Sequence, residues 1–210
     1  MMITAHSGCN GTAMNSMEYL RYASSLSVDA LEIDIRRNSD GVLLLTHDPI
    51  SDIPLLTLEK GFEFLRDKKI AINCDLKEYN LEDDVLECAE RIGVELYRLI
   101  FTGSITDCDS FRIDHPSLEV FINAEELVPK FYEKPQIDTL INRCKEYGYS
   151  VINIDYRLCD NRLIEMCKRA RISISAWTVD DLNTIQQLKA AGVLNLTTNL
   201  AKEAVMMSEP

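Results

Sequence analysis

The chain has 210 residues, of which 46% are hydrophobic and 27% are charged, a balance typical of a soluble globular protein with one sizeable core. We therefore expect a single domain over residues 1–210. The formal net charge of −12 argues against a nucleic-acid partner and against anionic membrane surfaces, because both require a basic footprint. An anionic substrate would need a local source of positive charge, such as a metal ion or a buried lysine.

The cysteines and the first residues bear on the cellular compartment. Seven cysteines, at positions 9, 74, 88, 108, 144, 159 and 167, are an odd number without C-x-x-C spacing, which indicates free thiols in a reducing environment. Residues 1–6 show no basic region followed by an apolar run, and no apolar stretch reaches membrane-spanning length. We expect a cytoplasmic protein without membrane insertion.

The first predicted elements are a strand and a helix. An apolar strand over residues 2–5 ends at His6 and is followed by a loop. Asn15, with Glu18 three positions later, resembles a capping box and predicts a helix that runs to about residue 26.

A hairpin follows. In the strand over residues 30–35, Glu32 and Asp34 alternate with apolar residues and so share one face. Such alternation is usually the solvated face of a half-buried strand. Residues 38–41 supply an Asn-Ser-Asp-Gly turn, and the return strand over residues 42–46 ends at His47. The hairpin is therefore expected to bring His47 back toward Asp34.

Strands and helices then alternate along the rest of the chain. Further strands are predicted over residues 70–76, 97–101, 118–122, 151–154, 172–177 and 193–197. Helices are predicted over residues 57–66, 81–92, 135–147 and 160–170, and from Asp180 or Asp181 to Gly192. The segment between the strands over residues 97–101 and 118–122 gives no readable pattern.

Without the return strand of the hairpin, the chain contains eight predicted strands separated mainly by helices. This repetition predicts an α/β fold, a closed (β/α)₈ TIM-type barrel with a hairpin that extends the second strand. An open doubly wound sheet is the alternative, but no glycine-rich turn follows the first strand. In a barrel the strand ends meet at one mouth, where they would gather these residues: His6, Glu32, Asp34, Asp75, Lys77, Asn123, Asp155, Trp177 and Asn199.

The gathered side chains predict phosphate chemistry. Crowded carboxylates need a cation, and the hard oxygens of Glu32, Asp34 and Asp75 suit Mg²⁺ or Ca²⁺. Lys77 is placed as a point charge for a phosphate, although a surface lysine or a salt bridge to Asp75 would explain it equally well. A pair of histidines, His6 and His47, can act as acid and base near neutral pH. Together these groups describe a phosphodiesterase.

Several motifs resemble the glycerophosphodiester phosphodiesterase family. They are Ala5-His6, Glu32-x-Asp34, Asp40-Gly41 with His47-Asp48, Asp75-x-Lys77, and Trp177-Thr178-Val179-Asp180 with Thr198-Asn199. The resemblance implies a TIM-type barrel and hydrolysis of small glycerophosphodiesters to glycerol 3-phosphate and an alcohol. It also implies a divalent cation on Glu32, Asp34 and Asp75, and His6 and His47 as the acid–base pair. Substrate contacts are implied for Lys77, Trp177 and Asn15.

The chain departs from the family pattern at three positions. Ser7 stands where the family usually has Arg, Met14 replaces the Glu of a Pro-Glu-Asn element, and Asp75 replaces a Glu ligand. Arg36 or Arg37 of the hairpin could replace the missing guanidinium. Only 27 residues separate His47 from Asp75, so the insertion domain of many relatives is expected to be small or absent.

Two other functions compete with the main hypothesis. One is a lysophospholipase D-like activity on an acylated substrate, which would need an apolar groove beside Trp177. The other is a catalytically silent barrel that binds phosphodiesters or a partner protein, for which Ser7 and Met14 are the evidence. The leaving alcohol, the preferred metal and the oligomeric state are left open by the residues.

Overall fold

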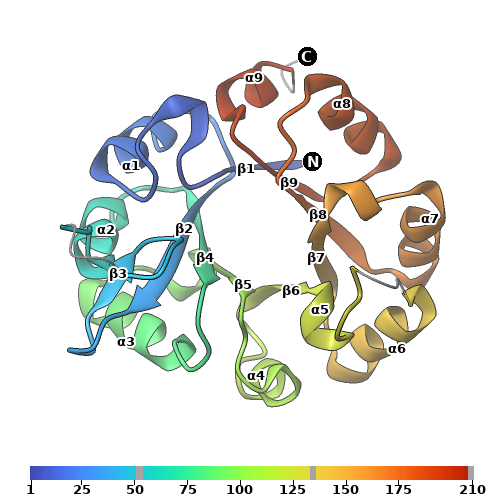
Figure 1. The fold of residues 1–210 in the computed structure, drawn as a ribbon, viewed down its shortest axis with the longest axis horizontal. Helices are drawn as coiled ribbons and strands as arrows, with labels where there is room; N and C mark the ends of the chain where they lie inside the picture. The colour runs from blue at the N-terminus through green and yellow to red at the C-terminus, as the bar shows by residue number, and fades with distance from the viewer. Residues whose placement is uncertain (51–53, 133–135, 208–210) are drawn as a thin grey trace.

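The computed structural model describes residues 1–50, 54–132 and 136–207, and its centre is a closed barrel of eight parallel strands (Figure 1). The barrel strands are β1 (Met2–Ala5), β2 (Ala30–Arg37), β4 (Ala71–Leu76), β5 (Leu99–Gly103), β6 (Glu119–Asn123), β7 (Val151–Asp155), β8 (Ser173–Trp177) and β9 (Asn195–Thr198). Neighbours along the chain pair in order, and β1 pairs with both β9 and β2, which closes the ring. The predicted TIM-type barrel is therefore confirmed.

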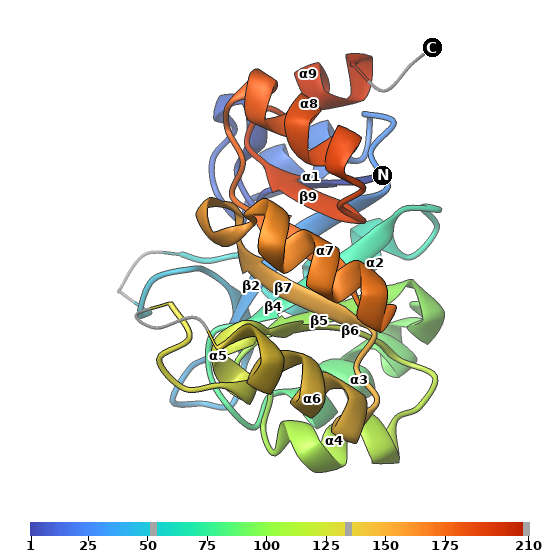
Figure 2. The same ribbon diagram turned by 90° about the vertical axis from the view of Figure 1, so that its right-hand side faces the viewer.

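Helices surround the strands, apart from a short helix at the mouth (Figures 1 and 2). The helices are α1 (Met17–Ala23), α2 (Leu58–Leu65), α3 (Glu82–Ile92), α4 (Cys108–Asp114), α5 (Ala124–Leu127), α6 (Ile137–Tyr147), α7 (Asn161–Ala170), α8 (Leu182–Ala191) and α9 (Ala201–Met206). Short 3₁₀ turns cover Cys9–Gly11, Leu96–Arg98 and Tyr156–Leu158. The described residues between the hairpin and β4 hold one helix, α2, in agreement with the small or absent insertion domain.

Some predicted boundaries were wrong for local reasons. The cap of α1 is Ser16, whose hydroxyl accepts from the backbone N–H of Tyr19, and not Asn15, which has a positive φ of 53°. β5 begins at Leu99 because the preceding residues form a 3₁₀ turn. The predicted helix start at Pro135 lies outside the described residues. Helices α4, α5 and α9 were not predicted.

Strand alternation separates two buried regions. On β2, Leu31, Ile33 and Ile35 belong to the main core, where the barrel meets the helices, while the residues between them face inward. Four inward residues near the strand starts form an apolar plug, Ala30, Ile100, Phe121 and Val151. Above the plug the barrel interior is polar and hydrogen bonded. In one chain of these bonds, Thr4 donates to Asn195, Asn195 to Ser175, Ser175 to Asn153, and Asn153 to Asn123.

The hairpin is fixed over the barrel rim by ion pairs. Strand β3 (Leu43–Leu45) pairs antiparallel with β2 and places Leu45 opposite Ile35. The guanidinium of Arg36 lies 3.0 Å from Glu78 Oε1 and also donates from Nε to the backbone carbonyl of His47, at 3.0 Å. Arg37 forms an ion pair with Asp84. The return strand therefore delivers His47 to the rim, as predicted.

Gly103 allows β5 to pass close to the end of β4. Its φ of +85° is a left-handed conformation, and a Cβ atom there would lie 2.2 Å from the carbonyl oxygen of Leu76 and 2.6 Å from Asp75 Oδ1. Gly148, which ends α6, has a similar φ of +75° but open space around it. An alanine would be strained by its positive φ at either position, but it would overlap neighbouring atoms only at position 103.

We expect Gly103→Ala to lower the free energy of unfolding by about 3 kcal/mol or more, because left-handed strain and overpacking add. Gly148→Ala should lose only the strain, about 1–2 kcal/mol. Urea unfolding of both variants measures the difference. Equal losses in the two variants would show that the close approach at Gly103 is not a constraint.

Candidate active site

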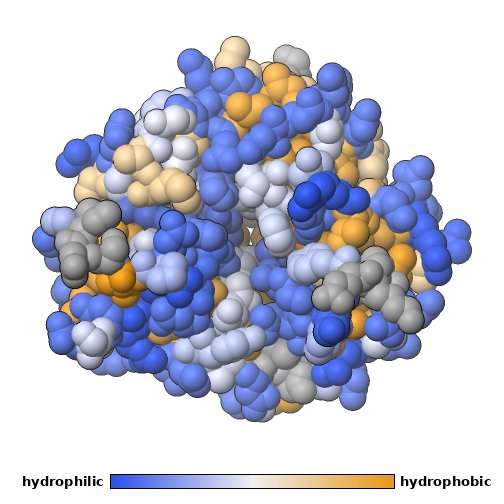
Figure 3. All heavy atoms as spheres, in the orientation of Figure 1, coloured by the Kyte–Doolittle hydropathy of each residue, from blue (hydrophilic) through white to orange (hydrophobic). Residues whose placement is uncertain are grey.

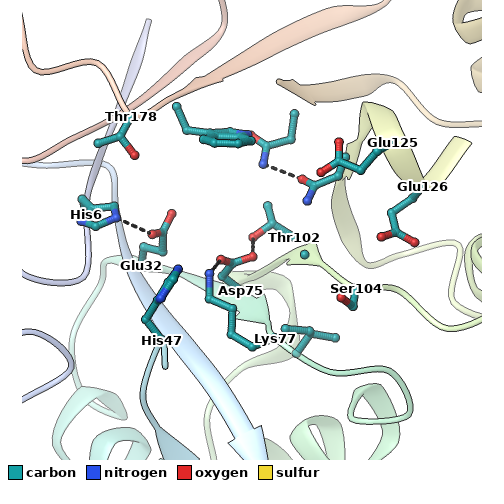
Figure 4. Close-up of a pocket in the computed structure, with 15 residues that line it drawn as sticks. His6, Glu32, His47, Asp75, Lys77, Thr102, Ser104, Glu125, Glu126 and Thr178 are labelled. Carbon is teal, nitrogen blue, oxygen red and sulfur yellow. Dashed lines mark hydrogen bonds and ion pairs between the residues drawn. The ribbon is translucent and has the colours of Figure 1, made fainter. Parts of the chain in front are cut away.

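A cavity of about 340 Å³ opens at the mouth of the barrel, where the strands end (Figure 4). Its lining includes seven residues predicted to meet there: His6, Glu32, His47, Asp75, Lys77, Asn123 and Trp177. Figure 3 shows mainly hydrophilic residues around the hollow at the centre of this face. The barrel thus gathers residues from β1, β2, the hairpin, β4, β6 and β8 into one polar cavity.

Three carboxylates are crowded at the base of this cavity. Glu32 and Asp34 are buried on β2, and the parallel register pairs Asp34 with Asp75 on β4. One oxygen from each of the three lies within 4.8 Å of the others. This buried acidic group could hold a metal ion, and its hard oxygen ligands suit a divalent cation.

Lys77 is the cation that balances these acids in the structure. Its ammonium lies 2.9 Å from Asp34 Oδ1 and also forms an ion pair with Asp75, so the two neighbouring carboxylates raise its pKa although burial opposes this. The predicted salt bridge to Asp75 is present, with Asp34 as a second partner. One lysine offsets only one of three negative charges.

The pKa values show the remaining imbalance. Burial raises the pKa of Glu32 and of Asp75, and repulsion from the neighbouring carboxylates adds to this. For Asp34 burial acts in the same direction, but Lys77 and the amide of Asn15 outweigh it and lower the pKa. Because the folded-state pKa values of Glu32 and Asp75 are raised, the fold is more stable when both groups are protonated. This part of the free energy of unfolding is lost as the pH rises through their folded-state pKa values. A dication would remove the repulsion, so the residues present fit a metal.

His6 is oriented by a relay of side chains. Asp180 can only accept, and its Oδ2 receives the Asn199 amide N–H at 2.8 Å, so the Asn199 oxygen must face His6. That oxygen lies 3.0 Å from His6 Nδ1, which must therefore carry the hydrogen. Nε2 is left directed toward Glu32, 3.7 Å from Oε1. Burial lowers the pKa of His6, which favours the neutral ring.

His47 faces the same space from the hairpin. Its side chain is 53% exposed, and Nδ1 lies 3.0 Å from Asp48 Oδ1, which leaves Nε2 available. Figure 4 shows His6 and His47 on the same side of the cavity, with Glu32 between them and Asp75 nearby. The two imidazoles thus lie beside the acidic group, in the cavity that a substrate would enter.

Asn15 and Ser7 lie behind the cavity. The Asn15 amide donates to Asp34 Oδ2 at 2.7 Å, and its oxygen accepts from the Asp34 backbone N–H at 3.0 Å. These bonds orient Asp34, so the substrate contact expected of Asn15 stays a prediction. Ser7 is fully buried. The hairpin arginines do not replace the missing guanidinium, because Arg36 and Arg37 are held by acids and are absent from the described lining of the cavity.

Of the other residues predicted at the rim, some line the cavity and some do not. Trp177 lines the cavity, and Tyr132 meets its ring edge-on at a centroid distance of 6.3 Å. Asn123 also lines the cavity, whereas Asp155 is bound by Arg157 and is absent from the described lining. Sequence reasoning missed the polar ring inside the barrel and the wall formed by Glu125 and Glu126. The alternation of Asn153 and Asn195 with apolar neighbours could have revealed the ring.

The chain is similar to known phosphodiesterases in sequence and in fold. Glycerophosphodiester phosphodiesterase GDPD4 of Arabidopsis thaliana is 21% identical over 249 residues, which cover 100% of this chain and 71% of that protein. A glycerophosphodiester phosphodiesterase from Parabacteroides distasonis superposes with a TM-score of 0.80 at 23% identity, over 98% of this chain and 95% of that one. A phosphodiesterase from Oleispira antarctica, solved with the product sn-glycerol-3-phosphate, gives 0.78 at 16% identity, over 100% and 97%. No protein-family model matches the chain.

These comparisons confirm the resemblance stated from the sequence, and the structural ones establish the fold. Among the described helices, none is long and apolar enough to cross a membrane. The six cysteines whose side chains are described are all free, as predicted, and five of them are buried.

We expect Mg²⁺ or Ca²⁺ to stabilise the protein. A cation at about 100 times its Kd should add about 2.7 kcal/mol, a rise in Tm of about 5–10 °C for a chain of this size. Asp75→Asn should abolish most of this rise because it removes one ligand charge. Asp83→Asn, at an exposed position of α3, should keep the rise in Tm. Differential scanning calorimetry with and without a chelator measures the shift. An unchanged rise in Asp75→Asn would contradict the assignment.

The relay predicts a tautomer. In neutral His6 the hydrogen should reside on Nδ1, and Asn199→Leu should remove this preference because no acceptor remains. The ring ¹⁵N shifts of His6 in long-range ¹H–¹⁵N spectra report it directly, with His115 as an internal control. An Nε2–H tautomer in the unmodified protein would overturn the proposed orientation.

Proposed function

We propose that the protein is a metal-dependent phosphodiesterase that hydrolyses glycerophosphodiesters to glycerol 3-phosphate and an alcohol. The observation that carries this proposal is that His6, His47, Lys77, Glu32 and Asp75 line one cavity, with the buried carboxylate of Asp34 beside those of Glu32 and Asp75. The likeness to named glycerophosphodiester phosphodiesterases, and to a phosphodiesterase with sn-glycerol-3-phosphate bound, supports the same substrate class.

In the proposed mechanism Glu32, Asp34 and Asp75 hold a divalent cation, Mg²⁺ or Ca²⁺. When bound, the cation would neutralise phosphoryl oxygens and lower the pKa of a hydroxyl group. Lys77 binds a phosphate oxygen as a point charge. Trp177 packs against the substrate at the opposite strand ends.

The two histidines move protons at their Nε2 atoms. His6, which is mostly buried and favoured in its neutral form, takes a proton from the attacking water as the water oxygen bonds to phosphorus, and later releases this proton to solvent. His47, which is half exposed, gives a proton to the oxygen of the leaving alcohol as the phosphorus–oxygen bond breaks, and recovers one from solvent. Asn199 accepts from Nδ1–H of His6 and stabilises the imidazolium that forms there. Asp48 accepts from Nδ1–H of His47 and stabilises the imidazolium that gives up its proton.

A second candidate is the lysophospholipase D-like activity on acylated substrates. A second groove of about 430 Å³ borders His47. Its apolar lining comes from three segments, with Met14 and Met17 from the first, Leu45 from the second and residues 54–56 from the third. From the sequence such a groove was expected beside Trp177, whereas this one lies beside His47. It has room for part of an acyl chain attached to the glycerol unit. Lysophosphatidylcholine is the substrate that tests it.

We expect the protein to release glycerol 3-phosphate from glycerophosphocholine with Mg²⁺ or Ca²⁺ present and to stop when a chelator is added. An assay coupled to glycerol-3-phosphate dehydrogenase measures the product. Faster release of choline from lysophosphatidylcholine than from glycerophosphocholine would favour the second candidate. Failure to cleave any glycerophosphodiester would favour a silent binding barrel.

We expect His47→Ala to lower kcat by at least about 100-fold, the usual contribution of general acid catalysis. The cation-induced rise in Tm should be nearly unchanged, because His47 is not one of the three acidic ligands. His115→Ala, which removes a histidine packed on Phe111 away from the cavity, is the matched control and should keep full activity. A large loss of cation affinity in His47→Ala would contradict its assigned role.

A further inference from the structure

One edge of β2 has a gap between two strand neighbours. Along its other edge β2 pairs continuously with β4, so β1 and β3 must share the remaining edge. On that edge the pairing with β1 ends at Leu31, and the pairing with β3 begins at Ile35. Residues 32–34 lie between these two ladders, and among the described strands none pairs with this part of the edge. The gap therefore falls at the backbone that carries Glu32 and Asp34.

Two side chains from the start of α1 occupy this gap. Asn15 accepts from the Asp34 backbone N–H at 3.0 Å. Tyr19 has the corresponding role one step lower, because its hydroxyl oxygen accepts from the Glu32 backbone N–H at 3.1 Å. The single hydrogen of this hydroxyl is shared between the carbonyl oxygens of Glu32 and Ala5, each 2.8 Å from the hydroxyl oxygen. Buried backbone groups need such partners, and here side chains supply them.

The Tyr19 hydroxyl connects the backbone of an acidic residue with the strand that carries a histidine. Ala5 is the last residue of β1, and the next residue is His6, whose Nε2 atom lies 3.7 Å from Glu32 Oε1. At this point the chain turns toward β9, where the His6 N–H donates to the Thr198 carbonyl at 3.0 Å. The hydroxyl thus bridges β1 and β2 at the last point at which they are paired, and its position sets how far Glu32 lies from His6.

Tyr19 itself lies outside the cavity. It is fully buried in the main core, so its hydroxyl is held by packing of the ring as well as by hydrogen bonds. Because it is absent from the described lining of the cavity, it can act on the site only through the residues that it holds. Partners of this kind, one step behind the ligands of a metal, typically lower metal affinity by about 10–100-fold when they are removed.

We propose that Tyr19 is a positioning residue for the metal site, because its hydroxyl fixes the backbone of Glu32 relative to His6. This inference rests on the proposed function and assigns to it a residue outside the cavity. Without the hydroxyl, the carbonyl oxygens of Ala5 and Glu32 lose their shared donor, and β2 is free to shift at the gap. The Asn73 amide still donates to Glu32 Oε2 at 3.1 Å, so we expect weaker binding of the cation and not its loss.

Removal of one hydroxyl group tests this role. In Tyr19→Phe we expect the affinity for Mg²⁺ or Ca²⁺, measured by calorimetric titration, to fall about 10-fold. Tyr97→Phe is the matched control, because it removes an exposed hydroxyl that is bonded to Glu95 on the turn before β5. This control should keep the affinity of the unmodified protein. An unchanged affinity in Tyr19→Phe would overturn the inference.

A purely structural role of Tyr19 would lower the stability alone. Ile185→Val is the comparison, because it takes a methylene group from the buried core at α8, outside the described lining of the cavity. Both Tyr19→Phe and Ile185→Val should have a lower Tm without cation. Only Tyr19→Phe should also show a smaller rise in Tm at a given cation concentration. Equal rises in the two variants would contradict the positioning role.

Activity gives a further comparison. At saturating cation, Tyr19→Phe should lower kcat for glycerophosphocholine about 10-fold and leave KM nearly unchanged, because Lys77 and Trp177 keep their contacts. A loss confined to KM would overturn the inference. If the unmodified protein cleaves no glycerophosphodiester, the proposed function fails, while the titration still tests Tyr19. If it binds neither Mg²⁺ nor Ca²⁺, both the proposed function and this inference fail.

The unmodified protein provides a test that needs no variant. A hydroxyl hydrogen held between two buried carbonyl oxygens exchanges slowly with water, so Tyr19 should give a hydroxyl proton signal in NMR spectra of protein with ¹³C-labelled tyrosine. Because the cation acts on Glu32, its addition should shift this signal. A hydroxyl that exchanges rapidly, or a signal that the cation leaves in place, would overturn the inference.

Discussion

The structure depends on the crowding of three carboxylates at the mouth of a closed barrel. Glu32, Asp34 and Asp75 approach within 4.8 Å because the pairing of β2 with β4 fixes their register. In a buried place such like charges repel, and Lys77 compensates only part of the repulsion. This unrelieved charge makes the site suited to a divalent cation. It also explains why the surrounding amides and hydroxyl groups are committed to fixed hydrogen bonds.

Those hydrogen bonds connect the site to the barrel. Asn73 donates to Glu32, and Thr102 donates to both Asn73 and Asp75, so β4 and β5 orient two of the acids. On the other side of the barrel, the chain of bonds from Thr4 to Asn123 satisfies the inward polar residues. The apolar plug seals the barrel below this ring. Polarity inside the barrel is thus confined to the half that faces the mouth, where it positions charged groups.

The two histidines reach this site by different routes. His6 ends a barrel strand and is held by Asn199 and Asp180 from the far end of the chain, so its orientation depends on the closure of β1 onto β9. His47 is carried by the hairpin, whose position depends on the ion pair of Arg36 with Glu78. A rigid, buried imidazole and a half-exposed one suit different halves of a proton transfer. Glu125 and Glu126 of α5 line the side of the cavity across from both histidines.

The sequence by itself determined the alternating faces, the eight strands, the hairpin and most of the charged side chains at the strand ends, because a period of two residues and turn chemistry are local properties. It also identified the three acids and both histidines as candidates that would meet. Only the tertiary structure decided the partners. Asn15 lies against Asp34 and does not cap α1, Lys77 bridges two acids, Asn199 orients His6, and Glu125 belongs to the cavity wall. These contacts join residues far apart in the chain, and their distances follow from barrel closure, which no local pattern encodes.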